Sequence, residues 1–158
     1  MSLSQIVFYS HNLLTLHGGT LRDMVRDILA SCSRYDRASG FTGALVFNEK
    51  FFLQAMEGDA VALSDQLWTL AADSRHNGMV LIAARTIEQR DFRGWTVGYA
   101  GHSEPLDTLY LRYGPKPQLD PTRMSLAGAV GLLRAFTEVE GNHFVQRSGP
   151  AVPAAAKA

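Results

Sequence analysis

The spacing of apolar residues near the start of the chain is the feature that most constrains its fold. Five apolar residues recur there at intervals of one and three positions: Leu21, Met24, Val25, Ile28 and Leu29. Such spacing is typical of an amphipathic α-helix, which buries its apolar face against another element. The apolar run Leu3–Tyr9 precedes it and predicts a strand. We therefore expect a strand, followed by a helix that begins at Thr20 and ends near Ser33.

Five more elements complete the first hundred residues. The apolar runs Phe41–Phe47 and Phe51–Met56 are separated by three residues, which is the spacing of a β-hairpin. Asp59 stands at the N-cap of a second helix. Residues 80–84 predict a buried strand, and Trp95–Ala100 predicts another. The order βαββαββ predicts an α+β, ferredoxin-like fold, in which a mixed sheet carries two helices on one face.

The composition changes after residue 101. Residues 105–113 predict a short helix, and Pro121 is well placed as the first residue of a further helix. We expect these C-terminal helices to cap the other face of the sheet or to contact a partner subunit. The low-complexity end of the chain predicts disorder. The expected organisation is a sheet domain over 1–101, a helical extension over 102–145 and a disordered tail over 146–158.

Charge and cysteine content exclude several classes of function. The 158 residues include 15 Lys and Arg and 15 Asp and Glu, so the formal net charge is zero. We expect neither nucleic acid nor membrane as a partner, because a neutral chain lacks long-range attraction to either. No apolar run approaches about 18 residues and no basic signal-peptide flank is present, which predicts a cytoplasmic protein. One cysteine and five scattered histidines predict no internal disulfide and no metal site.

A glutamine inside an apolar strand is the most informative candidate for chemistry. Gln54 interrupts the run Phe51–Met56, where a buried carboxamide without partners costs about 1–3 kcal/mol. Gln54 either faces solvent on an alternating strand or lines a pocket together with Tyr9. A phenol and an amide can relay a proton, but neither is a good base near neutral pH. The sequence predicts no enzyme, since a hydrolase built on Arg75 or Arg90 would lack a nucleophile.

Five short segments occur in order between Leu3 and Ala100. Each alone is too short to indicate a protein family, but the five together are specific. They are the first strand ending in Tyr9, followed by GFTGAL at 40–45, FLQAMEG at 52–58, DSRH at 73–76 and RDFRGW at 90–95. Together they resemble the BLUF family, the blue-light sensors that use FAD. The resemblance implies the same ferredoxin-like fold, with FAD bound non-covalently between the two helices and the tail helices on the far face of the sheet.

The resemblance also implies roles for individual residues. Tyr9 matches the family's electron and proton donor to the excited flavin, and Gln54 matches the glutamine whose hydrogen bonds rearrange afterwards and shift the absorption to the red. Arg75 and His76 match a basic pair near the polar side of the flavin. Trp95 matches the tryptophan that passes the signal to the tail. The expected output is a separate effector protein or a change in a homo-oligomer.

Three positions depart from the family pattern around the cofactor. Asp36 stands where the family has an asparagine that binds the flavin, and an ionised carboxylate only accepts hydrogen bonds. Thr69 replaces an arginine of many relatives, and Val97 replaces a methionine on the strand of the signalling tryptophan. These departures leave two hypotheses open. The chain is either a blue-light photoreceptor that binds FAD, or a flavin-free scaffold that serves protein interaction or oligomerisation.

Overall fold

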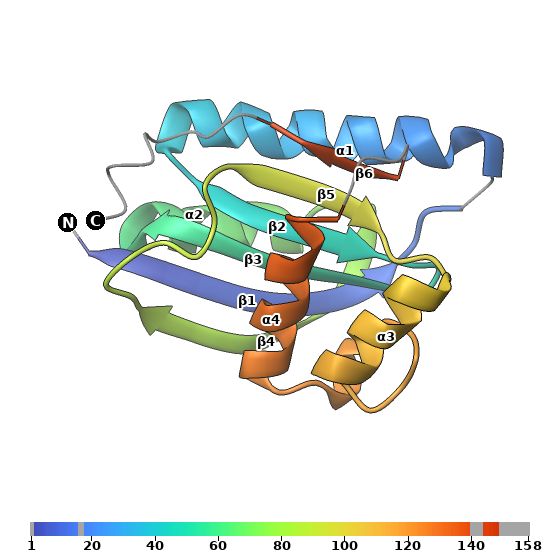
Figure 1. The fold of residues 1–158 in the computed structure, drawn as a ribbon. Helices are drawn as coiled ribbons and strands as arrows, with labels where there is room; N and C mark the ends of the chain where they lie inside the picture. Colours follow the sequence, from blue (N-terminus) through green and yellow to red (C-terminus); the bar gives the residue numbers. More distant parts are fainter. Residues whose placement is uncertain (1, 16–17, 140–143, 149–158) are drawn as a thin grey trace.

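The computed structural model describes residues 2–15, 18–139 and 144–148; the side chains of residues 18–19 and 33–39 lie outside that description. Figure 1 shows the course of the chain. Its elements are β1 (Leu3–Asn12), α1 (Gly18–Ser39), β2 (Thr42–Phe47), β3 (Phe51–Asp59), α2 (Ala60–Ala71), β4 (His76–Thr86), β5 (Trp95–Tyr99), α3 (Glu104–Tyr113), the 3-10 turn η1 (Pro121–Arg123), α4 (Leu126–Phe136) and β6 (Val145–Arg147).

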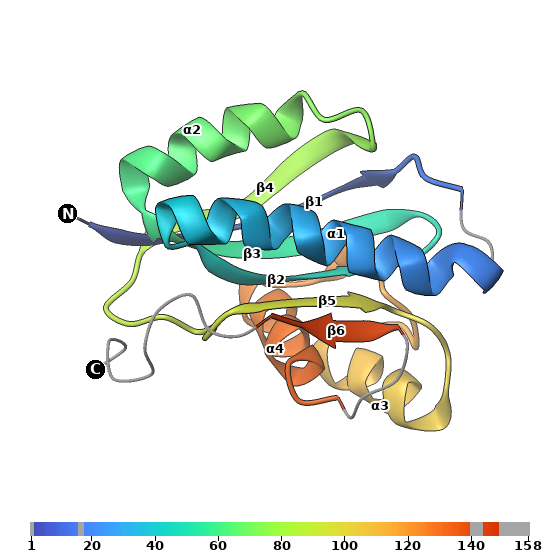
Figure 2. The ribbon, with the colours of Figure 1, turned by 90° about the horizontal axis from the view of Figure 1, so that it is seen from above.

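The strands of the described segments form one sheet in the order β4-β1-β3-β2-β5-β6. Neighbouring strands are antiparallel except β2 and β5, which are parallel. Figures 1 and 2 show three layers, with α1 and α2 on one face of the sheet and α3 and α4 on the other. The ferredoxin-like α+β fold predicted from the order of the elements is therefore confirmed, with the C-terminal helices on the second face.

Helix α1 is longer than the sequence predicts. It begins at Gly18 instead of Thr20, and it runs to Ser39 instead of ending near Ser33. Gly40 follows it with a φ of +69°, and this left-handed conformation favours glycine and ends a helix. The predicted apolar face is buried against the sheet through Leu21, Val25 and Ile28. The apolar period thus predicted which face of α1 packs, and the end of α1 coincides with a glycine.

Strand β4 lies at an edge of the sheet. The strand predicted over residues 80–84 is therefore present, but the prediction that it is buried is wrong. The sheet order gives β4 a single neighbour, β1. Val80 is 43% exposed and Leu81 is 48% exposed. A short apolar run does not distinguish a central strand from an edge strand, because that depends on the order in which distant strands pair.

Helices α3 and α4 belong to the main core of the molecule. Leu132, Leu133 and Phe136 of α4 pack with Val7 and Leu53 of the sheet. α3 matches the helix predicted over 105–113 to within one residue. The single helix predicted to begin at Pro121 is instead two elements.

The division between these two elements has a local cause. Pro121 opens the 3-10 turn η1, and α4 begins only at Leu126. The side chain of Ser125 accepts a hydrogen bond from the backbone N–H of Gly128 at 3.0 Å. Ser125 is therefore the N-cap that starts α4.

The sequence predicts a disordered tail from residue 146, but the first residues of that segment form a strand. Gln146 and Arg147 lie in β6, opposite Val97 and Thr96 of β5. The Arg147 guanidinium also donates to the carbonyl of Phe136 at 3.0 Å, at the end of α4, and basic side chains commonly satisfy free carbonyls there. Residues 149–158 lie outside the described residues.

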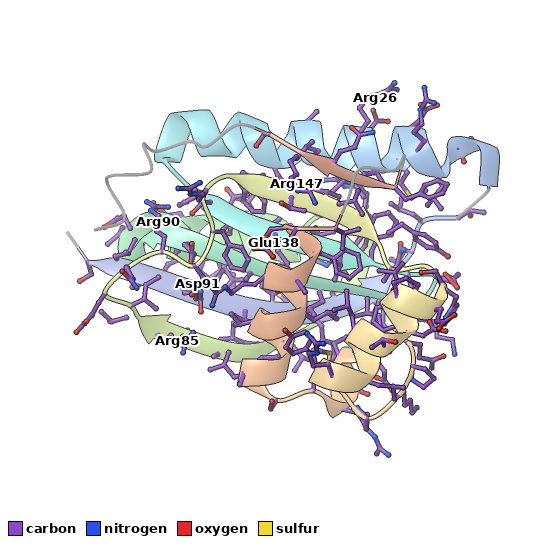
Figure 3. The ribbon with its side chains drawn as sticks, viewed as in Figure 1. Arg26, Arg85, Arg90, Asp91, Glu138 and Arg147 are labelled. Carbon is purple, nitrogen blue, oxygen red and sulfur yellow. The ribbon has the colours of Figure 1, made fainter. Side chains whose placement is uncertain are left out.

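A buried carboxylate anchors the loop between β4 and β5. Glu57 is fully buried, and it accepts hydrogen bonds from Gln5 Nε2 at 2.8 Å and from the backbone N–H of Asp91 at 2.7 Å. Burial raises the pKa of the Glu57 carboxyl above its ordinary value of 4.5. Arg85, Arg90 and Asp91 lie at the same end of the sheet (Figure 3). These contacts fix the loop that leads into β5.

Candidate functional site

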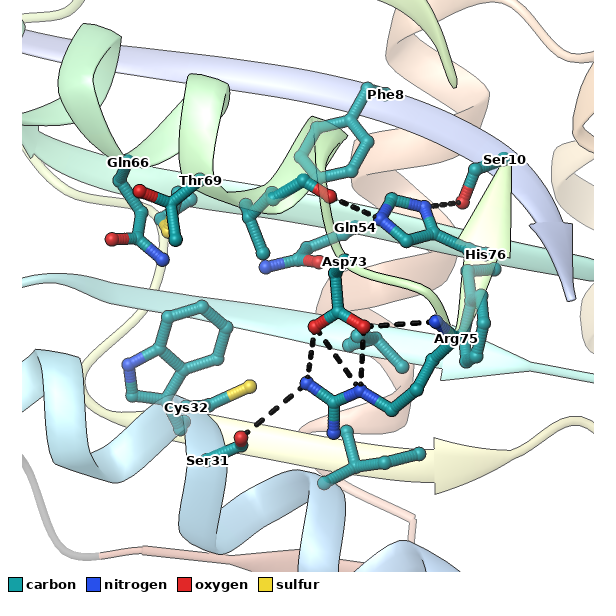
Figure 4. Close-up of a pocket in the computed structure, with 16 residues that line it drawn as sticks. Phe8, Ser10, Ser31, Cys32, Gln54, Gln66, Thr69, Asp73, Arg75 and His76 are labelled. Carbon is teal, nitrogen blue, oxygen red and sulfur yellow. Dashed lines mark hydrogen bonds and ion pairs between the residues drawn. The ribbon is translucent and has the colours of Figure 1, made fainter. Parts of the chain in front are cut away.

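A cavity lies between α1 and α2, with the sheet as its floor (Figure 4). About 750 Å³ of it, counting the part open to solvent, is free of atoms. Small-molecule sites usually combine apolar walls with a few polar groups. We call this site the α1/α2 cavity. Its polar residues come from β1, α1, β3, α2, the turn that follows α2 and the start of β4.

Two buried carboxamides line the α1/α2 cavity. Gln54 of β3 is 6% exposed and Gln66 of α2 is 8% exposed. Within the described part of the chain, neither side chain makes a hydrogen bond to another residue. Leaving a buried polar group unsatisfied costs about 1–3 kcal/mol. Of the two alternatives left open by the sequence, Gln54 faces the cavity, and both carboxamides are placed to bind a ligand that offers donors and acceptors.

The floor of the cavity is apolar. Phe8, Met56 and Trp95 line it, and each is at most 2% exposed. The Trp95 indole N–H donates to the carbonyl of Phe41 at 3.2 Å, so the ring has a fixed orientation. Such a floor buries the apolar body of a ligand at about 25 cal/mol for each Å² removed from water.

His76 links three elements at one end of the cavity. Its Nδ1 lies 2.7 Å from Ser10 Oγ on β1, and its Nε2 lies 2.5 Å from the carbonyl oxygen of Leu70 on α2. Because a carbonyl only accepts, Nε2 carries a proton in this arrangement. His76 therefore holds the start of β4 against β1 and α2.

The side chain of Arg75 spans the gap between the turn after α2 and α1 (Figure 4). Arg75 donates to the Asp73 carboxylate through Nε at 3.0 Å and through Nη2 at 2.7 Å. The same Nη2 donates to Ser31 Oγ of α1 at 3.5 Å. The hydrogen bond from Arg75 lowers the pKa of the Asp73 carboxyl below its ordinary value of 3.8. Arg75 thus connects both walls of the cavity.

The prediction that Tyr9 and Gln54 line one pocket is wrong. Tyr9 pairs with Leu53 across β1 and β3, and it packs with Leu53 in the core beneath α3 and α4. Its ring centroid lies 6.3 Å from that of Phe51, on the same face. Successive side chains of a strand point to opposite faces, so Phe8 points into the cavity and Tyr9 points away from it.

The other predicted site residues fall into three groups. Arg75, His76, Trp95 and Thr69 line the cavity. Val97 is fully buried beneath α1 with Leu21 and Val25, outside the lining. Asp36 lies in α1, and its side chain is outside the described part of the chain.

Sequence reasoning missed several lining residues, among them Phe8, Gln66 and Ser31. One signal for Phe8 was available, because it lies directly opposite Gln54 once β1 and β3 are paired in register. Gln66 and Ser31 lie on helices, and the sequence alone does not show which helix faces approach each other.

The described residues contain neither a membrane-spanning helix nor a cluster of metal ligands. No helix among them combines the length and the apolar character needed to cross a membrane. No three His, Cys, Asp or Glu side chains within the same ranges gather as they would around a metal ion.

The fold and the cavity define an α+β domain with a cavity between two helices on one face of a sheet. The sequence profile described as "BLUF: Sensors of blue-light using FAD" matches residues 3–98. The chain therefore belongs to the BLUF family. A comparison with curated proteins returned no match.

Solved structures of BLUF proteins share this fold. The photo-activated state of BlsA is 18% identical, with a TM-score of 0.71, and the match covers 89% of this chain and 98% of that chain. The dark state of BlrB is 22% identical, with a TM-score of 0.59, covering 70% and 80%. A bacterial light-regulated adenylyl cyclase is 20% identical, with a TM-score of 0.51, covering 59% and 26%.

The residues of the α1/α2 cavity fit a flavin ring. One edge of that ring carries two carbonyl oxygens and an imide N–H, ring nitrogens next to it accept hydrogen bonds, and the dimethylbenzene end is flat and apolar. The carboxamides of Gln54 and Gln66 have no partner within the described segments, and each offers a donor and an acceptor. Phe8, Met56 and Trp95 supply an apolar floor. The chemistry of the lining thus matches the cofactor named in the family description.

Proposed function

We propose that this chain is a sensory module that binds FAD non-covalently in the α1/α2 cavity and signals to a separate effector protein. The observation that carries the proposal is the buried Gln54 carboxamide, which lacks a partner among the described residues and lines the cavity. A buried amide in that condition is stabilised only when a ligand or water satisfies it. Membership of the BLUF family supports FAD as that ligand.

In this proposal, different cavity residues contact different parts of the flavin. Gln54 and Gln66 hydrogen-bond the polar edge of the flavin, and Phe8, Met56 and Trp95 exclude water from its apolar body. Arg75 and Asp73 join the turn after α2 to α1 through Ser31. Bound FAD supplies absorption of blue light and a set of hydrogen-bonding groups.

The face of the sheet opposite the cavity offers a route for output. Leu53 and Ala55 flank Gln54 on β3, and both pack in the core that contains α4. A change in the hydrogen bonds of Gln54 therefore acts on a strand that α4 also contacts. Trp95 and Val97 lie on β5, which pairs with β2 on one side and with β6 on the other. We propose that the effector binds on the side of α3 and α4.

Self-association is part of the same proposal. Trp68 of α2 is 79% exposed, and the edge strand β4 exposes Val80 and Leu81. Large exposed apolar side chains favour contacts between proteins. Light scattering of the purified chain at several concentrations tests for the expected homo-oligomer, and a monomer at every concentration contradicts it.

Titration of the apo-protein with FAD tests the proposed function. We expect saturable, stoichiometric binding and a yellow protein. Gln54→Leu weakens binding roughly tenfold, the factor that a net hydrogen bond of about 1–1.5 kcal/mol supplies. Gln118→Leu is the matched control, because Gln118 is exposed and lies outside the cavity. A protein that stays colourless at saturating FAD overturns the proposal.

A flavin-free scaffold is the second candidate. The observation that favours it is the contact of Arg75 with both Asp73 and Ser31, which joins the cavity walls without a ligand. In that case neither FAD nor riboflavin changes the thermal stability of the chain. Asp36→Asn then tests whether the departure from the family pattern at position 36 is the cause, since regained binding would identify it.

A further inference from the structure

Phe8 occupies the position from which a side chain can act on Gln54 and on a ligand beside it. The two residues are direct partners in the register of β1 and β3. Both line the α1/α2 cavity, where Phe8 is 1% exposed and Gln54 is 6% exposed. Figure 4 shows them on neighbouring strands, directed to the same side of the sheet. Tyr9 lies on the opposite face, in the core beneath α3 and α4.

A phenyl ring cannot take the part of a phenol in this position. It has no O–H to donate to Gln54 and no ionisable proton to pass on. Light-driven transfer from a tyrosine needs the phenol next to the carboxamide and the ligand, and the sheet separates Tyr9 from both. Among the described side chains, the cavity is lined by no tyrosine.

The remaining oxidisable ring in the described lining is Trp95. Its indole N–H is already donated to the carbonyl of Phe41 at 3.2 Å. A carbonyl oxygen is a very weak base, so it does not take up that proton near neutral pH. Trp95 is therefore poorly placed to move a proton toward Gln54.

From these observations we propose that Phe8 determines which stimulus this site responds to. Because position 8 is a phenylalanine, illumination does not switch the hydrogen bonds of Gln54. The module responds instead to whether flavin is bound. The inference rests on the proposed FAD binding. It assigns to Tyr9 a packing role on the α3/α4 face and to Phe8 the control of photochemistry. A single added hydroxyl at position 8 creates the missing donor.

The test compares FAD-loaded wild type with Phe8→Tyr, Tyr9→Phe and Phe8→Leu. We expect no lasting red shift after blue illumination in the wild type, in Tyr9→Phe or in Phe8→Leu. Phe8→Tyr gains a reversible red shift, and Gln54→Leu in the same chain abolishes it. The fluorescence of bound FAD is a second readout, and it does not require a light-adapted state. We expect weaker fluorescence in Phe8→Tyr than in Phe8→Leu, because the phenol quenches the excited flavin ring.

Each outcome decides a separate point. A reversible red shift in the wild type overturns the inference, whether or not Tyr9→Phe removes it. A folded Phe8→Tyr protein that binds FAD without a red shift also overturns it. If Phe8→Tyr does not fold, the wild type and Tyr9→Phe decide by the presence or absence of the shift. A wild type that binds no FAD overturns the proposed function itself, and the binding titration identifies that failure before any illumination.

Discussion

At the scale of single residues, Gln54 and Gln66 show a conflict between stability and the proposed binding of FAD. Both are buried carboxamides that line the cavity without a partner among the described residues. Residues that bind ligands are often retained although they destabilise the unliganded protein. The α1/α2 cavity therefore combines a well-packed floor with polar groups that the fold alone does not satisfy.

Replacing Gln54 tests this conflict in the apo-protein. We expect Gln54→Leu to raise the free energy of unfolding of the apo-protein by about 1–2 kcal/mol, because the buried amide is removed and the volume is retained. Urea unfolding without FAD measures the change. A less stable apo-protein would show that Gln54 is satisfied within the fold. Gln118→Leu, at an exposed position, controls for the added apolar surface.

The ion pair of Asp73 predicts that the free energy of unfolding depends on pH. Its carboxyl has a lowered pKa in the folded chain, chiefly because Arg75 donates to it. A group with a depressed folded pKa stabilises the protein above its unfolded pKa, and this stability is lost as the pH falls through the folded pKa. We expect Asp73→Asn to be less stable than the wild type at pH 7, with a difference that narrows below about pH 4.

Urea unfolding across this pH range measures the effect of Asp73→Asn. Asp65→Asn is the control, because Asp65 is exposed on α2. A difference between wild type and Asp73→Asn that stays constant with pH would contradict the role of the ion pair.

At the scale of elements, α3 and α4 form part of the core and are not a detachable extension. Leu133 is fully buried against the sheet, and Leu111 of α3 is 56% exposed. The Tyr110 hydroxyl donates to the carbonyl of Gly101 at 2.6 Å, which fixes the start of the C-terminal region. We therefore expect residues 102–148 to unfold together with the sheet.

A pair of leucines tests this unity. Leu133→Ala is expected to lower the free energy of unfolding by about 2–5 kcal/mol, because it leaves a cavity beneath α4. Leu111→Ala, the matched control, changes it by less than about 0.5 kcal/mol. Both are measured by urea unfolding with far-UV circular dichroism. Two separate transitions in the wild type would show that the C-terminal helices fold on their own.

At the scale of the whole molecule, the cavity has walls from α1, from α2 and the turn after it, and from the sheet. A ligand there contacts elements that are distant in sequence and binds only the folded chain. Ligands of this kind stabilise a protein by mass action. The thermal stability of the whole chain is therefore a direct report on occupancy of the α1/α2 cavity.

FAD is expected to raise the free energy of unfolding by about 2.7 kcal/mol at a free concentration of roughly 100 times its Kd. Differential scanning fluorimetry across an FAD series measures the rise, with FMN and riboflavin as comparison ligands. Equal stabilisation by all three would show that only the ring is bound. An unfolding temperature that is independent of FAD would contradict a site in the α1/α2 cavity.

The sequence alone determined the order of the elements from β1 to β5 and the buried face of α1. The period of Leu21, Val25 and Ile28 predicted the buried side of α1, and Asp59 capped α2 where expected. These features are local, because they depend on spacing and on hydrogen bonds within a few residues. The same local rules placed Gln54 on a strand between apolar neighbours.

Only the tertiary structure decided which of two adjacent residues enters the site. Phe8 and Tyr9 lie on opposite faces of β1, and a shift of one residue exchanges every side chain between the faces. Which face borders the cavity depends on where α1 and α2 pack, many residues away in sequence. The edge position of β4 was likewise set by distant strand pairing. Spacing along the chain carries no information about either, because both depend on contacts between elements that the sequence separates.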